Sequence, residues 1–183
     1  MLQMSAVLAG GVRRGVGSGV DEFSVRLTAQ PLSRDVIEID VATIRAKLTA
    51  GDAPGLLGVL ESASVDFKSE PYILTSNRQK QELAKDLSAL VNAGGGMVVF
   101  GYKTAKATGK ATDVVVEERA FPLAMCDEDQ RRKVAGDWVY PPIAGLVFEN
   151  FPTTGGKGYL SITVPNQPTS ARPFLSSQGR VGH

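Results

Sequence analysis

Apolar positions at helical spacing predict helices over residues 41–49 and 78–92, and an acidic start that suits the helix dipole supports a third over residues 127–139. Asp40 and Asn77 are suitable N-caps for the first two, because a short polar side chain can accept a bond from a free backbone N–H. The apolar positions on the core-facing sides of these two helices are Val41, Ile44, Leu48, Leu83, Leu87, Leu90 and Val91. We expect each helix to pack this stripe against a common core.

Two kinds of strand pattern lie between these helices. Residues 97–100 are continuously apolar and bounded by glycines, which is typical of a central strand buried on both faces. Val65 and Phe67 alternate with polar residues, which indicates a half-buried strand. Further strands are predicted over residues 22–27, 113–116, 146–151, 159–164 and 172–175.

The start of the chain differs from the remainder. Residues 10–20 are rich in glycine and carry no periodic pattern. Such composition favours a flexible segment. We therefore expect an N-terminal arm over residues 1–34 and one domain over residues 35–183.

Composition gives the general class of protein. Of the 183 residues, 43% are hydrophobic and 21% are charged, as in soluble globular proteins. The net charge of +1 favours neither a nucleic acid nor any other class of partner. The distribution is more informative, because residues 103–110 carry three lysines and no acid. This segment is predicted as a loop whose lysines either contact nucleic-acid phosphates or are simply solvated.

Several classes of site are excluded by counts of single residue types. The one cysteine, Cys126, cannot form an intrachain disulfide, which fits a reducing compartment. The one histidine, His183, is the last residue, so catalytic sets and zinc sites built on an internal histidine are excluded. No apolar run approaches the length of a membrane span. We expect a cytoplasmic protein with no membrane partner.

Three charged residues at the strand predicted around Val65 and Phe67 are candidates for chemistry. Glu61 and Asp66 flank the loop-to-strand junction, and Lys68 follows on the strand. Hard divalent cations such as Mg²⁺ and Mn²⁺ prefer carboxylate oxygens, so the two acids are candidate metal ligands. Alternation alone also accounts for Asp66 and Lys68 as solvent-facing residues around Phe67.

A glycine turn, residues 94–96, separates the second helix from the apolar strand. Glycine lets another backbone or a phosphate approach closely, and it is also the usual residue after a helix end. It is not a P-loop, because that motif requires a strand before the glycines and a lysine after them.

Taken in order, these segments resemble a known family. Residues 61–68 are ESASVDFK, residues 89–96 are ALVNAGGG, and residues 97–102 are MVVFGY. PPI at 141–143, ITVP at 162–165 and RPFL at 172–175 follow. This series resembles the Schlafen-type AlbA domain over residues 56–175. The resemblance implies a single α/β domain with a mixed β-sheet and flanking helices, which binds DNA or RNA.

Some members of that family are metal-dependent endoribonucleases with three carboxylates. By this resemblance Glu61 and Asp66 match two of them, and the third position falls on Thr104, preceded by Lys103. A threonine and a lysine thus replace two acids, which favours nucleic-acid binding over cleavage.

We therefore predict a nucleic-acid-binding domain that contacts mainly the phosphate backbone. The predicted contact residues are Lys68, Arg78, Lys103, Lys106 and Lys110. One alternative is an endoribonuclease that uses Mg²⁺ or Mn²⁺ on Glu61 and Asp66, with Asp113 as a third ligand. Another is a protein-interaction module that forms a homodimer or binds a partner protein.

Overall fold

The computed structural model describes residues 36–177. The predicted arm over residues 1–34 and the predicted strand over residues 22–27 lie outside the described residues, and the domain boundary at residue 35 stays a prediction. The described α-helices are α1 (Val41–Thr49), α2 (Asn77–Asn92) and α3 (Glu128–Trp138). The strands are β1 (Val65–Lys68), β2 (Gly96–Phe100), β3 (Tyr102–Lys106), β4 (Asp113–Glu118), β5 (Phe121–Pro122), β6 (Val139–Tyr140), β7 (Val147–Pro152), β8 (Lys157–Val164) and β9 (Leu175–Ser176).

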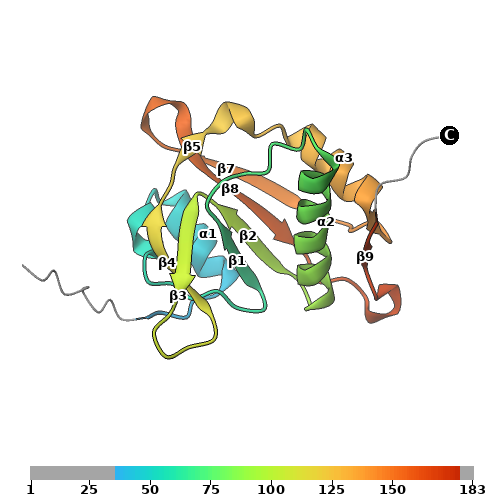
Figure 1. The fold of residues 1–183 in the computed structure, drawn as a ribbon, viewed down its shortest axis with the longest axis horizontal. Coiled ribbons are helices and arrows are strands. Elements are labelled where there is room, and N and C mark those ends of the chain that lie inside the picture. The colour runs from blue at the N-terminus through green and yellow to red at the C-terminus, as the bar shows by residue number, and fades with distance from the viewer. Residues whose placement is uncertain (1–35, 178–183) are drawn as a thin grey trace, which may run out of the picture. The chain divides into compact units, whose positions relative to one another are not determined.

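The central sheet is mixed, as predicted. β1 and β2 run parallel and are connected through α2, while β2 and β7 each pair antiparallel with β8. The resulting order is β1-β2-β8-β7, and the short strand β5 pairs with the first residues of β8. Figure 1 shows α2 running alongside the sheet in the β1–α2–β2 connection. The prediction of one α/β domain with a mixed sheet and flanking helices is confirmed for the described residues.

β2 is buried on both faces, which explains its continuous apolar sequence. Val98 and Phe100 belong to a core cluster with α2 and α3. Met97 and Val99 belong to a second cluster with α1 and the β3–β4 hairpin. Each face of the sheet is thus covered by a different layer.

The predicted helices are confirmed, with one change at a cap. Asp40 caps α1 by accepting a 2.7 Å hydrogen bond from the Thr43 amide. The N-cap of α2 is Ser76 and not Asn77, because Ser76 has extended backbone angles and its hydroxyl accepts from the Gln79 amide at 3.3 Å. The apolar residues predicted to face the core from α2 are all buried.

Part of the segment predicted as a lysine loop is a strand. β3 covers residues 102–106 and pairs antiparallel with β4, with a bulge between Lys103 and Thr104. Tyr102 anchors the hairpin in the core, where its ring stacks on Tyr159 with centroids 4.9 Å apart. Lys103 and Lys106 are therefore strand residues, and the loop proper is residues 107–112.

The glycine turn serves packing of backbone on backbone. Gly95 has φ +100°, and a Cβ there would lie 2.8 Å from both the Asn166 amide nitrogen and the Val164 carbonyl oxygen. A Cβ on Gly96 would lie 2.3 Å from the Ser64 carbonyl oxygen. The turn also ends α2, because the Gly94 amide donates to the Val91 carbonyl at 3.3 Å and the Gly95 amide to the Leu90 carbonyl at 2.9 Å. The geometry therefore supports both a helix end and the close approach of the chain's own backbone.

Candidate functional site at the edge of the sheet

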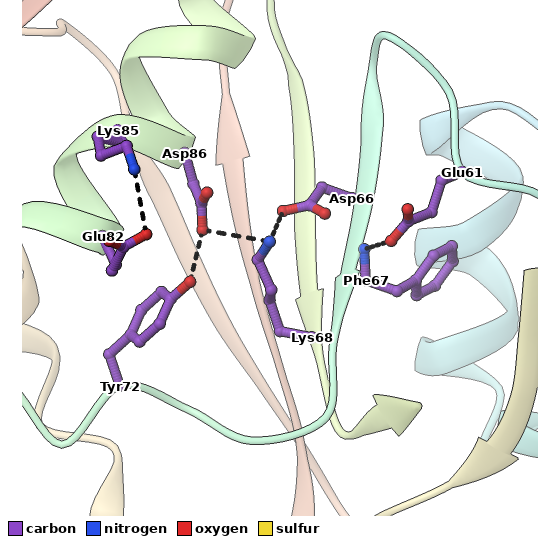
Figure 2. Close-up of polar contacts among 8 residues, drawn as sticks. All are labelled: Glu61, Asp66, Phe67, Lys68, Tyr72, Glu82, Lys85 and Asp86. Carbon is purple, nitrogen blue, oxygen red and sulfur yellow. Dashed lines mark hydrogen bonds and ion pairs between the residues drawn. The ribbon is translucent and has the colours of Figure 1, made fainter. Parts of the chain in front are cut away.

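The predicted acids and Lys68 lie at β1, which is an edge strand because it pairs with β2 alone among the described strands. Val65 and Phe67 point into the cluster with α1, so Asp66 and Lys68 point to the opposite face, where α2 lies. Lys68 Nζ is 2.8 Å from Asp66 Oδ2 and 3.6 Å from Asp86 Oδ2. Figure 2 shows Lys68 between these two carboxylates, with Asp86 contributed by α2.

Two members of this cluster, Asp86 and Tyr72, were missed by the sequence analysis. The Tyr72 hydroxyl donates a 2.8 Å hydrogen bond to Asp86 Oδ2 (Figure 2). Asp86 precedes Leu87 and lies beside the apolar stripe of its helix, where polar residues are common. Its approach to Lys68 depends on how α2 packs on this face of the sheet, which no local pattern encodes.

Glu61 has a structural partner at the free edge of β1. Its Oε1 accepts a 3.0 Å hydrogen bond from the Phe67 amide, as a neighbouring strand would (Figure 2). The Glu61 amide in turn donates to the Asp113 carbonyl at 2.9 Å, which attaches this segment to the start of β4. The structure thus brings the backbones of Asp113 and Glu61 together.

The charges at this edge shift one another's pKa values. Burial raises the pKa of Glu61, and the nearby charges of Asp66 and Asp113 add to the rise, while the Phe67 amide and Lys68 oppose it. Burial also raises the pKa of Asp86 against the opposing effects of Lys68 and Tyr72. For Lys68, burial lowers the pKa, but the hydrogen bond and charge of Asp66 and the charge of Asp86 outweigh it and raise the pKa. Lys68 therefore stays cationic in this acidic setting.

The acids at this edge do not fit a preformed metal centre. Among residues 36–177, no three or more His, Cys, Asp or Glu side chains are grouped to hold a metal ion. Glu61 Oε1 accepts a bond from the Phe67 amide, while Asp66 and Asp113 form ion pairs with Lys68 and Lys106, each at 2.8 Å. Thr104, at the third position of the family pattern, lies on β3 opposite Val115 and brings no carboxylate.

The predicted phosphate-binding residues fall into separate groups. Lys103, Lys106 and Lys110 share the β3–β4 hairpin and are exposed. Lys103 Nζ lies 3.7 Å from Glu117 Oε2, and Lys106 Nζ lies 2.8 Å from Asp113 Oδ1. Among residues 36–177, no acidic oxygen lies within 4.0 Å of Lys110 Nζ. Arg78 is exposed in the first turn of α2, which follows the C-terminal end of β1. The hairpin loop lies instead at the N-terminal end of β1, where Asp113 contacts Glu61.

Comparisons with known proteins give only distant similarities. No protein-family profile matches the chain, and no curated protein matches it. Among solved structures, it is similar to the N-terminal domain of a protein from Nitrosomonas europaea described as a putative ATP-dependent DNA helicase RecG-related protein. The identity is 18% and the TM-score 0.41, over 79% of this chain and 86% of that one. It is also similar to the DIP2311 protein from Corynebacterium diphtheriae, at 16% identity and a TM-score of 0.37, over 70% of this chain and 29% of that one. Neither similarity is close enough to assign a function.

The described helices also fall short of the requirements of a membrane span. Within residues 36–177, the helices are too short or too polar for any of them to cross a bilayer. The predicted cytoplasmic location stays a prediction.

Proposed function

We propose that this protein is a nucleic-acid-binding domain of the Schlafen AlbA type, which contacts phosphates through Lys103, Lys106 and Lys110. The observation that supports this most directly is that the three lysines lie exposed on one hairpin. The order of sequence segments that resembles the family supports the kind of ligand. Nothing in this proposal requires a bound metal.

The ion pairs on the hairpin do not prevent phosphate binding. The Lys103 and Lys106 side chains are 48% and 75% exposed, and solvent screens ion pairs of such exposed side chains strongly. A phosphate can replace the carboxylate at little cost, because binding to nucleic acid also releases condensed counterions. Lys68, held by two acids and only 29% exposed, is less available.

The proposal is tested by fluorescence anisotropy with labelled single-stranded RNA, single-stranded DNA and duplex DNA at low salt. Replacing Lys103, Lys106 and Lys110 together by glutamine is expected to weaken binding at least about tenfold. The slope of log K against log salt should fall in magnitude by about 2 for a single strand, because each neutralised phosphate contributes about 0.7 to that slope.

A matched control removes the same charge elsewhere. Lys80, Lys133 and Lys157 lie on α2, α3 and β8, and their replacement by glutamine should leave binding nearly unchanged. Absence of wild-type binding to all three probes, or equal losses in the two triple variants, would contradict the proposal.

Metal-dependent RNA cleavage is the second candidate, and the position of Asp113 beside Glu61 is the observation that favours it. If it holds, RNA incubated with Mn²⁺ is cut by the wild type and left intact by Glu61→Gln. Glutamine keeps an oxygen for the Phe67 amide, so loss of cleavage would report on the carboxylate and not on folding. Intact RNA with the wild-type protein and Mn²⁺ would rule this candidate out.

A further inference from the structure

We propose that Asp86 competes with phosphate for Lys68 and thereby keeps a fourth cation out of the nucleic-acid surface. This inference rests on the proposed function, because it concerns how the same surface is restrained. Asp86 would be a residue that limits affinity, so its loss should strengthen binding.

Two acidic side chains engage the ammonium group of Lys68. Its ammonium group has three donors, and the two acidic neighbours lie 2.8 Å and 3.6 Å from Nζ (Figure 2). Asp66 and Asp86 are only 27% and 18% exposed, so this pairing is better shielded from water than the pairs on the hairpin. A phosphate that reaches Lys68 must replace these contacts, and the exchange is less favourable than at an exposed ion pair.

Asp86 is held in place and cannot easily turn away. The Tyr72 hydroxyl donates to it at 2.8 Å, as Figure 2 shows. The Tyr72 carbonyl in turn accepts a 3.2 Å bond from Arg131 of α3, a residue that is only 2% exposed. The position of Asp86 is therefore fixed by two helices and by the loop that joins β1 to α2.

The local charge balance also opposes phosphate binding at Lys68. Glu61, Asp66 and Asp86 carry three negative charges when ionised against the single positive charge of Lys68, a balance of −2. A phosphate close to Lys68 therefore meets net repulsion. Replacing Asp86 with a neutral residue lowers this repulsion and leaves Lys68 with one directly bonded acid.

Lys68 is near enough to the hairpin to join its surface once released. The Gly101 amide donates a 2.8 Å hydrogen bond to the Lys68 carbonyl, and β3 begins at the next residue, Tyr102, so the hairpin starts directly beside Lys68. A strand bound along the hairpin lysines would pass this edge of the sheet.

The test compares Asp86→Asn with Glu82→Gln in the same anisotropy assay. Glu82 lies one turn earlier on α2 and pairs with Lys85 at 3.4 Å, so its replacement removes the same charge without releasing Lys68 (Figure 2). Asp86→Asn is expected to bind single-stranded RNA about three- to tenfold more tightly than Glu82→Gln, with a salt slope steeper by about 0.7. Adding Lys68→Gln to Asp86→Asn should abolish this gain.

Lys68→Gln alone gives a second measurement that does not depend on the folding of the Asp86 variant. It should change the affinity by less than about twofold, because Lys68 is already engaged by the two acids. A several-fold loss in this single variant, equal gains in Asp86→Asn and Glu82→Gln, or a gain that survives Lys68→Gln would overturn the inference. The hairpin triple variant tests the proposed function separately, because it leaves Asp86 and Lys68 in place.

Discussion

At the scale of single residues, Glu61 illustrates how a candidate ligand acquires a structural role. β1 is an edge strand, and an unpaired backbone N–H in a partly buried setting costs free energy. The Glu61 carboxylate satisfies the Phe67 N–H at 3.0 Å and so takes the place of a missing strand. Because the Phe67 N–H bonds to Oε1, a role as a ligand would fall mainly to the other carboxylate oxygen, Oε2.

The raised pKa of Asp86 predicts a pH dependence of stability. Its ordinary value is 3.8, and burial raises the pKa in the folded protein, so above pH 3.8 the folded state binds more protons here than the unfolded state. This group therefore lowers the free energy of unfolding as pH rises from about 4 through its folded pKa. Asp86→Asn removes that contribution, and its stability relative to wild type should increase with pH across this window.

The measurement is urea unfolding of the wild type and Asp86→Asn at several pH values between about 4 and 7. Glu70→Gln, at an exposed position in the loop before α2, is the control and should follow the wild type. A constant difference between wild type and Asp86→Asn at all pH values would show that the carboxyl does not titrate as described.

At the scale of elements, the turn between α2 and β2 shows what a local pattern can and cannot specify. The sequence predicts that the helix ends near Asn92 and that a buried strand begins after the glycines, and both are confirmed. The reason for the glycines is tertiary, because Gly95 lies against the backbone after β8 and Gly96 against Ser64. Asn92 also holds the C-terminal segment, since its side chain exchanges two 2.8 Å hydrogen bonds with the Phe174 backbone.

This turn gives a matched pair of stability predictions. Gly94 and Gly95 have φ of +109° and +100°, so alanine is strained at both. A Cβ on Gly94 would have no atom within 4 Å, whereas one on Gly95 would meet backbone atoms at 2.8 Å. Gly95→Ala should therefore cost about 1–3 kcal/mol more than Gly94→Ala in denaturant unfolding. Equal losses would indicate that backbone strain alone matters at this turn.

At the scale of the whole domain, pairing of strands changes the meaning of the lysine segment. Residues 103–110 contain no acid, yet antiparallel pairing places Glu117 beside Lys103 and Asp113 beside Lys106. The lysine segment is basic in sequence, but on the surface of the folded domain two of its lysines lie beside acidic side chains of the neighbouring strand. The five predicted cations likewise divide into the hairpin group, the restrained Lys68 and the separate Arg78.

The sequence by itself determined the elements and most of the core. The hydrophobic periodicity of a segment indicates which of its residues are buried. The helices α1, α2 and α3 and the buried strand β2 could therefore be predicted from single segments. It also identified Glu61, Asp66 and Lys68 as neighbours at one strand.

Only the tertiary structure decided what surrounds these residues. Asp86 and Tyr72 come from positions 18 and 4 residues after Lys68. Asp86 reaches Lys68 because α2 packs on the face of the sheet to which Lys68 points, and Tyr72 then bonds to Asp86 from the loop before α2. Partners of this kind depend on the packing of one element on another, which local periodicity does not record. The same is true of the Glu61 bond at the free edge and of the acids that face the hairpin lysines.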